Sequence, residues 1–242
     1  MEPAIVSGGF DDLSSPHIRF LEEASRHGEL HVLLWSDQLF ESVEHRRPRF
    51  PETERKYFLD AIRYVKHVQI ISELPNRPAI PLDISDPNLR RFPKSPATPV
   101  DLSPTGRKRV VVTGSFDWLH TGHVRFFEEV SEYGDVYAVV GHDGNIALLK
   151  GKQHPHFPED ERRYVVGSLR FVKQALISTG HGWMDAEPEI ARIKPHIYAV
   201  NHDGDKPEKR LFCEQHGIQY LVLSRLPKPG LTPRTSTELR GF

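Results

Sequence analysis

The stretch Thr113-Gly114-Ser115-Phe116-Asp117-Trp118-Leu119-His120-Thr121-Gly122-His123 decides the fold of this chain. A β-branched run at residues 110–112 precedes it and is typical of a buried strand. Apolar residues at helical spacing follow it over residues 124–130. The pattern predicts a strand, a loop and a helix whose first turn carries two histidines. Such a turn binds anions through its free N–H groups and its positive dipole end, and Gly122 lets a phosphate approach the backbone closely.

The sequence after this motif alternates between strand and helix patterns. Strands are expected at residues 110–114, 136–140, 174–178, 196–200 and 219–223, and helices at residues 122–132, 159–169, 185–192 and 206–216. This alternation predicts an α/β fold with a doubly wound parallel sheet. Such sheets bind ligands at the carboxyl ends of their strands, where the strand order reverses, and the histidine motif lies at such an end.

The chain contains an internal duplication at an offset of 106 residues. Residues 6–23 align with residues 112–129, and after a slip of one residue the segment 50–57 aligns with the segment 157–164. A period of this kind indicates two copies of one structural unit. Eight prolines lie among the polar residues between the copies, a composition typical of an extended linker. The predicted parts are a truncated, degenerate copy at residues 1–74, a proline-rich linker at residues 75–107 and a complete domain at residues 108–242.

The two copies differ at the positions that would contact a phosphate. Ser14 stands in the first copy where His120 stands in the second, and Pro16 replaces Gly122. Proline removes an N–H group that a phosphate could use. We therefore expect only the second copy to be catalytic.

The string from Thr113 to His123 resembles the signature of the cytidylyltransferase-like nucleotidyltransferase superfamily, whose fold is Rossmann-like. The resemblance implies transfer of a nucleotidyl group from a nucleoside triphosphate, with release of pyrophosphate. It implies catalytic roles for His120, His123, Lys150 and Arg234. It also implies nucleotide contacts from Thr113, Gly114, Ser115, Phe116, Gly122, Asn201, Asp203, Thr235, Ser236 and Thr237.

The acceptor is expected to contact Asp117, Asp143 and Lys152, and each of these has an alternative explanation. Asp117 can orient its loop or cap the following helix. Asp143 can be structural, because Asp37 takes its place in the first copy. Lys150 and Lys152, expected in a loop after the second strand of this copy, can be solvated surface lysines.

The resemblance leaves the nucleotide and the acceptor open. CTP is expected rather than ATP, because the motifs follow the order of the cytidylyl branch, and the acceptor is expected to be a phosphorylated or phosphonate alcohol. The shortened tail at residues 233–240 also resembles the adenylyl relatives, so an ATP-dependent adenylyltransferase is the first alternative. A non-catalytic nucleotide sensor is the second. The tandem layout is similar to that of the phosphoethanolamine cytidylyltransferases, in which the complete copy comes first.

The composition limits the class of partner. The formal net charge is −1, so there is no general attraction to nucleic acid or to an anionic membrane. No apolar run approaches the ~18 residues of a membrane span. Cys213 is the chain's one cysteine, which fits a reducing cytoplasm, where we expect the protein to work.

No metal site is predicted within the protein, although a triphosphate would bring Mg²⁺ with it. His154 and His156 flank Pro155, but no further ligand lies at a suitable spacing in the sequence. The two copies are expected to pair with each other as an intrachain pseudo-dimer. The resemblance places that contact at residues 63–65 and 170–172.

Overall fold

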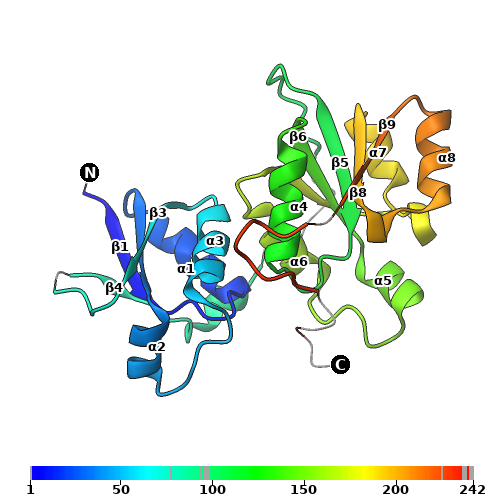
Figure 1. Cartoon of the computed structure of the whole chain (residues 1–242). Helices are drawn as coiled ribbons and strands as arrows, with labels where there is room; N and C mark the ends of the chain where they lie inside the picture. The colour runs from blue at the N-terminus through cyan, green and yellow to red at the C-terminus, as the bar shows by residue number, and fades with distance from the viewer. Residues whose placement is uncertain are drawn as a thin grey trace. The chain divides into compact units, whose positions relative to one another are not determined.

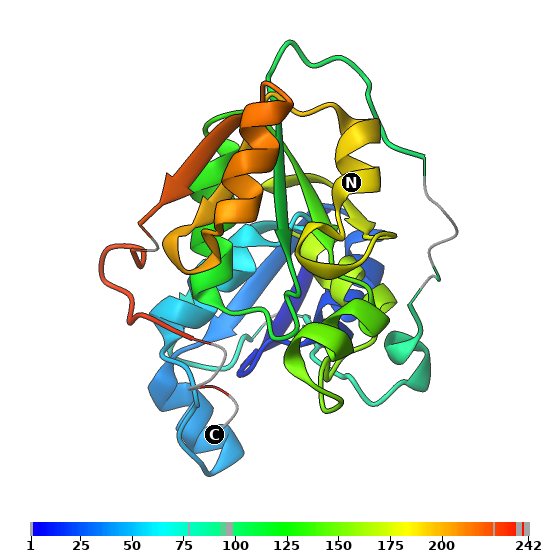
Figure 2. The ribbon, with the colours of Figure 1, turned by 90° about the vertical axis from the view of Figure 1, so that its right-hand side faces the viewer.

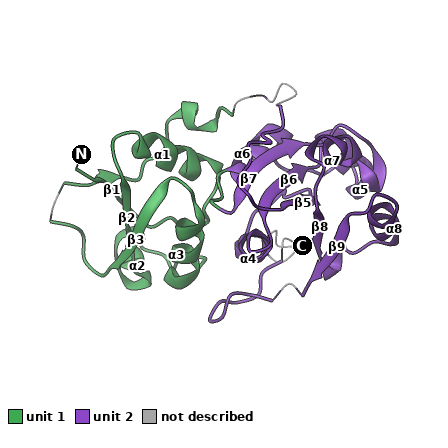
Figure 3. Ribbon diagram, turned by 90° about the horizontal axis from the view of Figure 1, so that it is seen from above, with its two compact units in different colours: residues 1–92, 168–170 green, residues 93–167, 171–242 purple. Residues whose placement is uncertain are grey.

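The computed structural model describes residues 2–76, 78–92, 94, 99–224, 226–235 and 239. The chain forms two compact units, shown in different colours in Figure 3. The first comprises Met1–Phe92 and Ser168–Arg170, and the second comprises Pro93–Gly167 and Phe171–Phe242. Each unit is built on a parallel sheet covered by helices, which confirms the predicted α/β fold class (Figure 1).

The second unit has a five-stranded parallel sheet in the order β7-β6-β5-β8-β9. Its strands are β5 (Arg109–Gly114), β6 (Asp135–Val140), β7 (Val172–Ile177), β8 (Ile197–Asn201) and β9 (Gln219–Leu223). Its helices are α4 (Thr121–Ser131), α5 (Asp143–Lys150), α6 (Glu159–Gly167), α7 (Glu187–Ile193) and α8 (Pro207–Gln215), with 3-10 turns η2 (Gly182–Met184) and η3 (His202–Gly204). Figure 2 shows α8 beside β9, against which it packs. The chain runs outward from β5 in both directions, so the strand order reverses between β5 and β8.

The hydrophobic periodicity located these strands and four of these helices to within about two residues. Helix α5 was not predicted, and Lys150, expected in a loop, is instead its last residue. Gly144 and Asn145 lower the intrinsic helix propensity of this segment. Contacts outside the helix compensate: His142 Nδ1 accepts a hydrogen bond from Asn145 N at 3.2 Å, and Asn145 Nδ2 donates to Gly182 O at 3.1 Å.

The first unit repeats this arrangement with the strand order β3-β2-β1-β4. Its strands are β1 (Ala4–Gly8), β2 (Leu30–Trp35), β3 (Val65–Ile71) and β4 (Ile80–Pro81), and its helices are α1 (Ser15–Ser25), α2 (Asp37–Glu44) and α3 (Glu52–Ala61), with a 3-10 turn η1 (Pro87–Arg90). The short segment Ser168–Arg170 belongs to this unit, and its Leu169 forms an isolated antiparallel bridge with Ile62.

Part of the segment expected to be a linker is folded. Ile80 and Pro81 pair with Val6 and Ser7 in parallel, so β4 takes the place beside β1 that β8 takes beside β5. Proline is tolerated here because β4 is an edge strand. Leu89 is also buried, in η1. The first unit therefore extends beyond residue 74, and among its described residues the turn η1 follows β4, without counterparts of α8 and β9.

Cys213 is buried against the sheet of the second unit, and this burial raises the pKa of its thiol to about 11. A thiol with a raised pKa is a poor nucleophile, so Cys213 is a packing residue. Among the described residues, no helix is long and apolar enough to cross a membrane.

Candidate active site

A cavity of 650 Å³ opens in the second unit where the strand order reverses. Its walls include Gly114 at the end of β5, Gly141 after β6 and Asn201 at the end of β8. Small-molecule sites have volumes of about 300–1,000 Å³, so the cavity can hold a nucleotide. Ten of the residues expected to contact substrate line it: Thr113, Gly114, Ser115, Phe116, Gly122, His123, Lys150, Asn201, Asp203 and Thr235.

The two motif histidines lie together at the start of α4. His120 is the N-cap residue, and its Nδ1 accepts a hydrogen bond from Gly122 N at 3.1 Å. The His120 and His123 rings lie 4.1 Å apart between centroids. His123 lines the cavity, whereas His120 lies behind it and is 3% exposed. The pair therefore adds imidazoles to the positive end of a helix dipole, as the sequence predicted.

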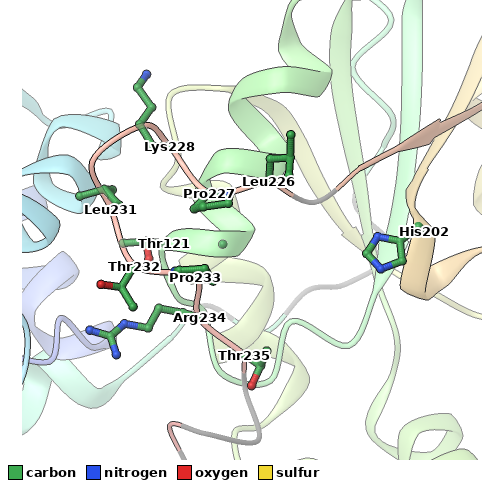
Figure 4. A pocket seen from close by; sticks show the side chains of 11 residues that line it. Thr121, His202, Leu226, Pro227, Lys228, Leu231, Thr232, Pro233, Arg234 and Thr235 are labelled. Carbon is green, nitrogen blue, oxygen red and sulfur yellow. The ribbon is translucent and has the colours of Figure 1, made fainter.

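Gly122 is required by two close neighbours. A Cβ atom at this position would lie 2.9 Å from His120 Cε1 and 3.1 Å from Arg234 O. The segment at residues 226–235 therefore crosses the start of α4, where it forms a 240 Å³ pocket with Thr121 and Gly122. Figure 4 shows this pocket and the Arg234 side chain, which extends away from His202. Arg234 lines this pocket and not the larger cavity, and Ser236 and Thr237 lie outside the described residues.

The two lysines expected at the site have different positions. Lys150 Nζ donates a 2.8 Å hydrogen bond to Ser115 Oγ, which joins the end of α5 to the loop that carries the histidines. Lys152 lies two residues further along the chain, is exposed and does not line the cavity. The structure thus brings Lys150 into the predicted cluster but not Lys152.

Asp143 is bound to a buried arginine. Arg162, 1% exposed, donates to Asp143 Oδ1 at 2.7 Å and also to the carbonyl oxygens of Ser115, Gly141 and Phe157. The first unit repeats the pair, with Arg55 donating to Asp37 Oδ1 at 2.7 Å. The repetition in a unit without the histidine pair supports the structural alternative for Asp143.

Asp117 also has a counterpart with the same contacts. Asp117 Oδ1 accepts hydrogen bonds from His156 N at 2.8 Å and Phe157 N at 3.1 Å. In the first unit Asp11 Oδ1 accepts from the two equivalent amides, at 2.9 and 3.1 Å. Asp117 therefore orients two loops relative to each other. It does not cap α4, because His120 occupies that position.

Sequence reasoning missed a lysine that lines the cavity and a buried tyrosine next to that lysine. Lys209 lines it from α8, 3.4 Å from Thr113 Oγ1 and 5.7 Å from the centre of the Tyr198 ring. Burial lowers the pKa of Lys209 and raises that of Tyr198, whose hydroxyl is hydrogen-bonded to Thr113 Oγ1 at 2.7 Å. Perturbed groups in a cavity mark functional sites. Nothing in the spacing of α8 could have placed Lys209 beside β5.

In the first unit, side chains pack closely against two glycines, the last residue of β1 and the residue that follows it. A Cβ atom on Gly8 would lie 2.7 Å from Leu82 Cβ, and one on Gly9 would lie 2.4 Å from the Phe40 ring. His17 Nδ1 accepts from Ser14 N at 3.2 Å, and burial lowers the pKa of His17 to about 4. His17, the counterpart of His123 in the first unit, therefore takes part in capping helix α1.

Comparison with known proteins assigns the second unit, which contains this cavity, to a known family. Residues 111–225 match the model of the cytidylyltransferase-like family. A FAD synthase of Archaeoglobus profundus is 38% identical over 104 residues, which are 43% of this chain and 63% of the relative. A FAD synthase of Aciduliprofundum boonei is 38% identical over 125 residues, which are 50% of this chain and 80% of the relative. The bifunctional protein HldE of Aliarcobacter butzleri is 32% identical over 120 residues, which are 49% of this chain and 25% of HldE.

The extent of these matches varies. The chain spans 63% and 60% of the length of two FAD synthases, from Archaeoglobus profundus and Ferroglobus placidus. Among solved structures, a lipopolysaccharide core biosynthesis protein from Thermoplasma volcanium GSS1 aligns with a TM-score of 0.40 and 26% identity, covering 48% of this chain and 93% of that chain.

Proposed function

Because the chain belongs to the cytidylyltransferase-like nucleotidyltransferases, we propose that its second unit transfers an adenylyl group from ATP to a phosphorylated acceptor. The observation that carries this proposal is the His120–His123 pair at the start of α4, with Lys150 held on Ser115 at the same cavity. These groups can donate hydrogen bonds to the phosphates of a nucleoside triphosphate.

The chemistry is an in-line displacement at the α-phosphorus. An oxygen of the acceptor's phosphate attacks this phosphorus, the bond to the bridging oxygen of the β-phosphate breaks, and pyrophosphate leaves with both bonding electrons. The protein positions the two reactants and stabilises the negative charge of the transition state. His120, His123 and Lys150 supply donors for that charge, and Lys209 adds a cation from α8. Mg²⁺ enters as part of the MgATP substrate.

The comparisons favour ATP over the CTP expected from the sequence. The relatives include several FAD synthases, and FAD is FMN joined to AMP, so its synthesis from FMN is an adenylyl transfer. CTP is the second candidate, favoured by the order of the motifs and by Asn201-His202-Asp203 after β8. Asn201 and Asp203 line the cavity, where their amide and carboxylate groups can bond a ribose or a base.

The cavity also offers a surface for a planar ring. Trp183 lines it and is 52% exposed, and Lys206 Nζ lies 5.0 Å from the centre of the Trp183 ring. An exposed indole stacks well on adenine or on a flavin ring. FMN is therefore the first acceptor to test, ahead of phosphorylated or phosphonate alcohols.

The first unit has a structural role in this proposal. The two copies pair as an intrachain pseudo-dimer through residues 63–65 and 170–172. The support is the recurrence of Arg63-Tyr64-Val65 as Arg170-Phe171-Val172 at equivalent positions. Small-angle scattering of the full chain tests this: a compact particle supports the pair, and separated domains contradict it.

Pyrophosphate release tests the reaction itself. The full chain is incubated with MgATP or MgCTP and each acceptor in turn, and the product is identified by its mass. Release with ATP and a phosphorylated acceptor supports the proposal, and a preference for CTP moves the protein to the second candidate. Tight nucleotide binding without pyrophosphate release under any condition would identify a sensor.

A further inference from the structure

We propose that Asp117, His154 and His156 bind a divalent transition-metal ion such as Zn²⁺ in the second unit. One potential ligand atom from each of these side chains lies within 4.8 Å of the others. Asp117 comes from the loop before α4, whereas both histidines come from the loop before α6. This separation explains why the spacing of His154 and His156 in the sequence did not reveal a third ligand. The proposal does not depend on which nucleotide the cavity binds.

The geometry of one pair points to a shared ion. His154 Nδ1 lies 3.6 Å from Asp117 Oδ2, which is too long for a hydrogen bond. Two ligand atoms on a tetrahedral Zn²⁺, each at ~2.1 Å, lie about 3.4 Å apart. The observed separation is therefore close to that of two ligands of one metal. The rings of His154 and His156 lie 5.4 Å apart between centroids, so each imidazole can direct one nitrogen toward the same ion.

The carboxylate is already oriented for this role. Asp117 is 4% exposed, and its Oδ1 accepts the hydrogen bonds from the amides of His156 and Phe157. Those contacts turn Oδ2 toward His154 and fix the loop that carries both imidazoles. Hydrogen bonds that fix a ligand in this way raise the affinity of a metal site.

In the first unit, arginines rather than histidines surround the corresponding carboxylate, Asp11. Arg47 and Arg49 stand where His154 and His156 stand in the second unit. The neighbouring Arg46 holds Asp11 Oδ2 with a 2.8 Å ion pair, and Arg49 pairs with Asp12 at 2.9 Å. A buried carboxylate needs a compensating charge. Guanidinium groups lie beside this carboxylate in the first unit, whereas imidazoles, which are metal ligands, lie beside it in the second.

The ligand set selects the metal. Imidazole favours Zn²⁺, Co²⁺, Ni²⁺ and Cu²⁺, whereas Mg²⁺ and Ca²⁺ prefer oxygen ligands. The site is therefore distinct from the Mg²⁺ that accompanies a nucleotide. These three residues do not line the 650 Å³ cavity, so the ion would join the histidine-motif loop to the loop before α6 rather than contact substrate.

Zinc stoichiometry of the full chain tests the proposal. Protein stripped with a chelator is dialysed against Zn²⁺ in excess Mg²⁺, without nucleotide, and bound zinc is measured by atomic emission. Loading with Co²⁺ gives a second readout through its visible absorption. We expect one equivalent that the double variant His154→Arg/His156→Arg loses, with at least a tenfold loss of zinc affinity.

The double variant copies the arginines of the first unit, so its fold should survive. Circular dichroism and the thermal midpoint without metal check this. The matched control is His67→Ala, because His67 forms a pair with His31 at 5.8 Å in the first unit and belongs to no such cluster among the described residues. Added Zn²⁺ should raise the thermal midpoint of the wild type and of this control, and leave that of the double variant unchanged. A wild type that binds no zinc, or a double variant that binds it equally, overturns the proposal.

Discussion

Lys150 Nζ lies 2.8 Å from Ser115 Oγ, and this hydrogen bond joins the end of one unexpected helix to the loop that carries the histidine pair. The ammonium group is thereby held at the cavity wall, where the proposed function requires a donor to the phosphates of the nucleotide. The first unit has no lysine in the corresponding stretch of residues 43–47. The contact thus distinguishes the complete copy from the degenerate one.

Lys150→Ala should lower kcat/KM for the nucleotide. A hydrogen bond to a charged group contributes about 1.5–3 kcal/mol, so the expected loss is about 10–100-fold. Steady-state pyrophosphate release measures it. Lys152→Ala is the matched control, and its kcat/KM should stay within about twofold, because Lys152 is exposed outside the cavity. Equal losses in the two variants would show that a general positive charge is what matters.

Asp143→Asn should leave turnover nearly unchanged, although the sequence suggested contact with the acceptor. Its side chain is 44% exposed and pairs with Arg162. The substitution should therefore lower the free energy of unfolding by only about 1 kcal/mol. Arg162→Met should lower the free energy of unfolding by about 3–5 kcal/mol, because it removes donors from buried carbonyl oxygens and leaves Asp143 unpaired. Denaturant titration compares the two. An acceptor KM that rises tenfold in Asp143→Asn would restore the substrate role.

Lys209→Met should raise the KM for the nucleotide by about tenfold, which corresponds to about 1.4 kcal/mol of lost binding. The ammonium group lies beside Thr113 and Tyr198 at the cavity, and burial already lowers its pKa. Methionine keeps the packing of the side-chain stem. Isothermal titration with each triphosphate measures the change, and unchanged affinity would limit Lys209 to packing.

The first unit should lose stability in mild acid through His17. Burial lowers the folded-state pKa of His17 to about 4 from an ordinary value of 6.5, with Asp11 raising it and Arg90 lowering it. The unfolded chain therefore binds more protons between these values. Stability is fully present above pH 6.5 and falls as the pH drops toward 4, by about 3 kcal/mol in total.

His17→Gln isolates this contribution. Glutamine at the third helical position can keep the capping contact with Ser14, and it does not titrate. The free energy of unfolding of the wild type, taken relative to that of the variant, should therefore fall by about 3 kcal/mol from pH 7 to pH 4. A difference that does not change with pH would contradict the assignment to His17.

The fold could be predicted largely from the sequence because the strands and most helices of the second unit carry strong hydrophobic periodicity. The folded part of the expected linker could not, because the pairing of Ile80 and Pro81 with β1 is a tertiary contact of a proline-rich segment. The duplication was visible in the sequence, and the Asp–Arg pair that recurs in both units supports the structural alternative for Asp143.

The positions of His123, Lys150 and the motif glycines at one cavity could be predicted because one contiguous motif and one short segment after β6 carry these residues. Lys209 and the cluster around Asp117 could not. The positions of Lys209 and of this cluster depend on tertiary contacts between loops and helices at the end of the sheet. Hydrophobic periodicity within one segment does not reveal such contacts. The nucleotide could not be predicted from the sequence motifs either. Their order favours CTP, whereas the similarity to FAD synthases favours ATP.

The central claim is that the His120–His123 site of the second unit performs the transfer. The most direct test measures kcat for pyrophosphate release from MgATP, with a working acceptor, in His123→Ala and in His17→Gln. The account predicts a loss of about 10²–10³-fold for His123→Ala, as when a donor to transition-state charge is removed, and a change within about twofold for His17→Gln. Comparable losses in both variants, or full turnover in His123→Ala, would contradict it.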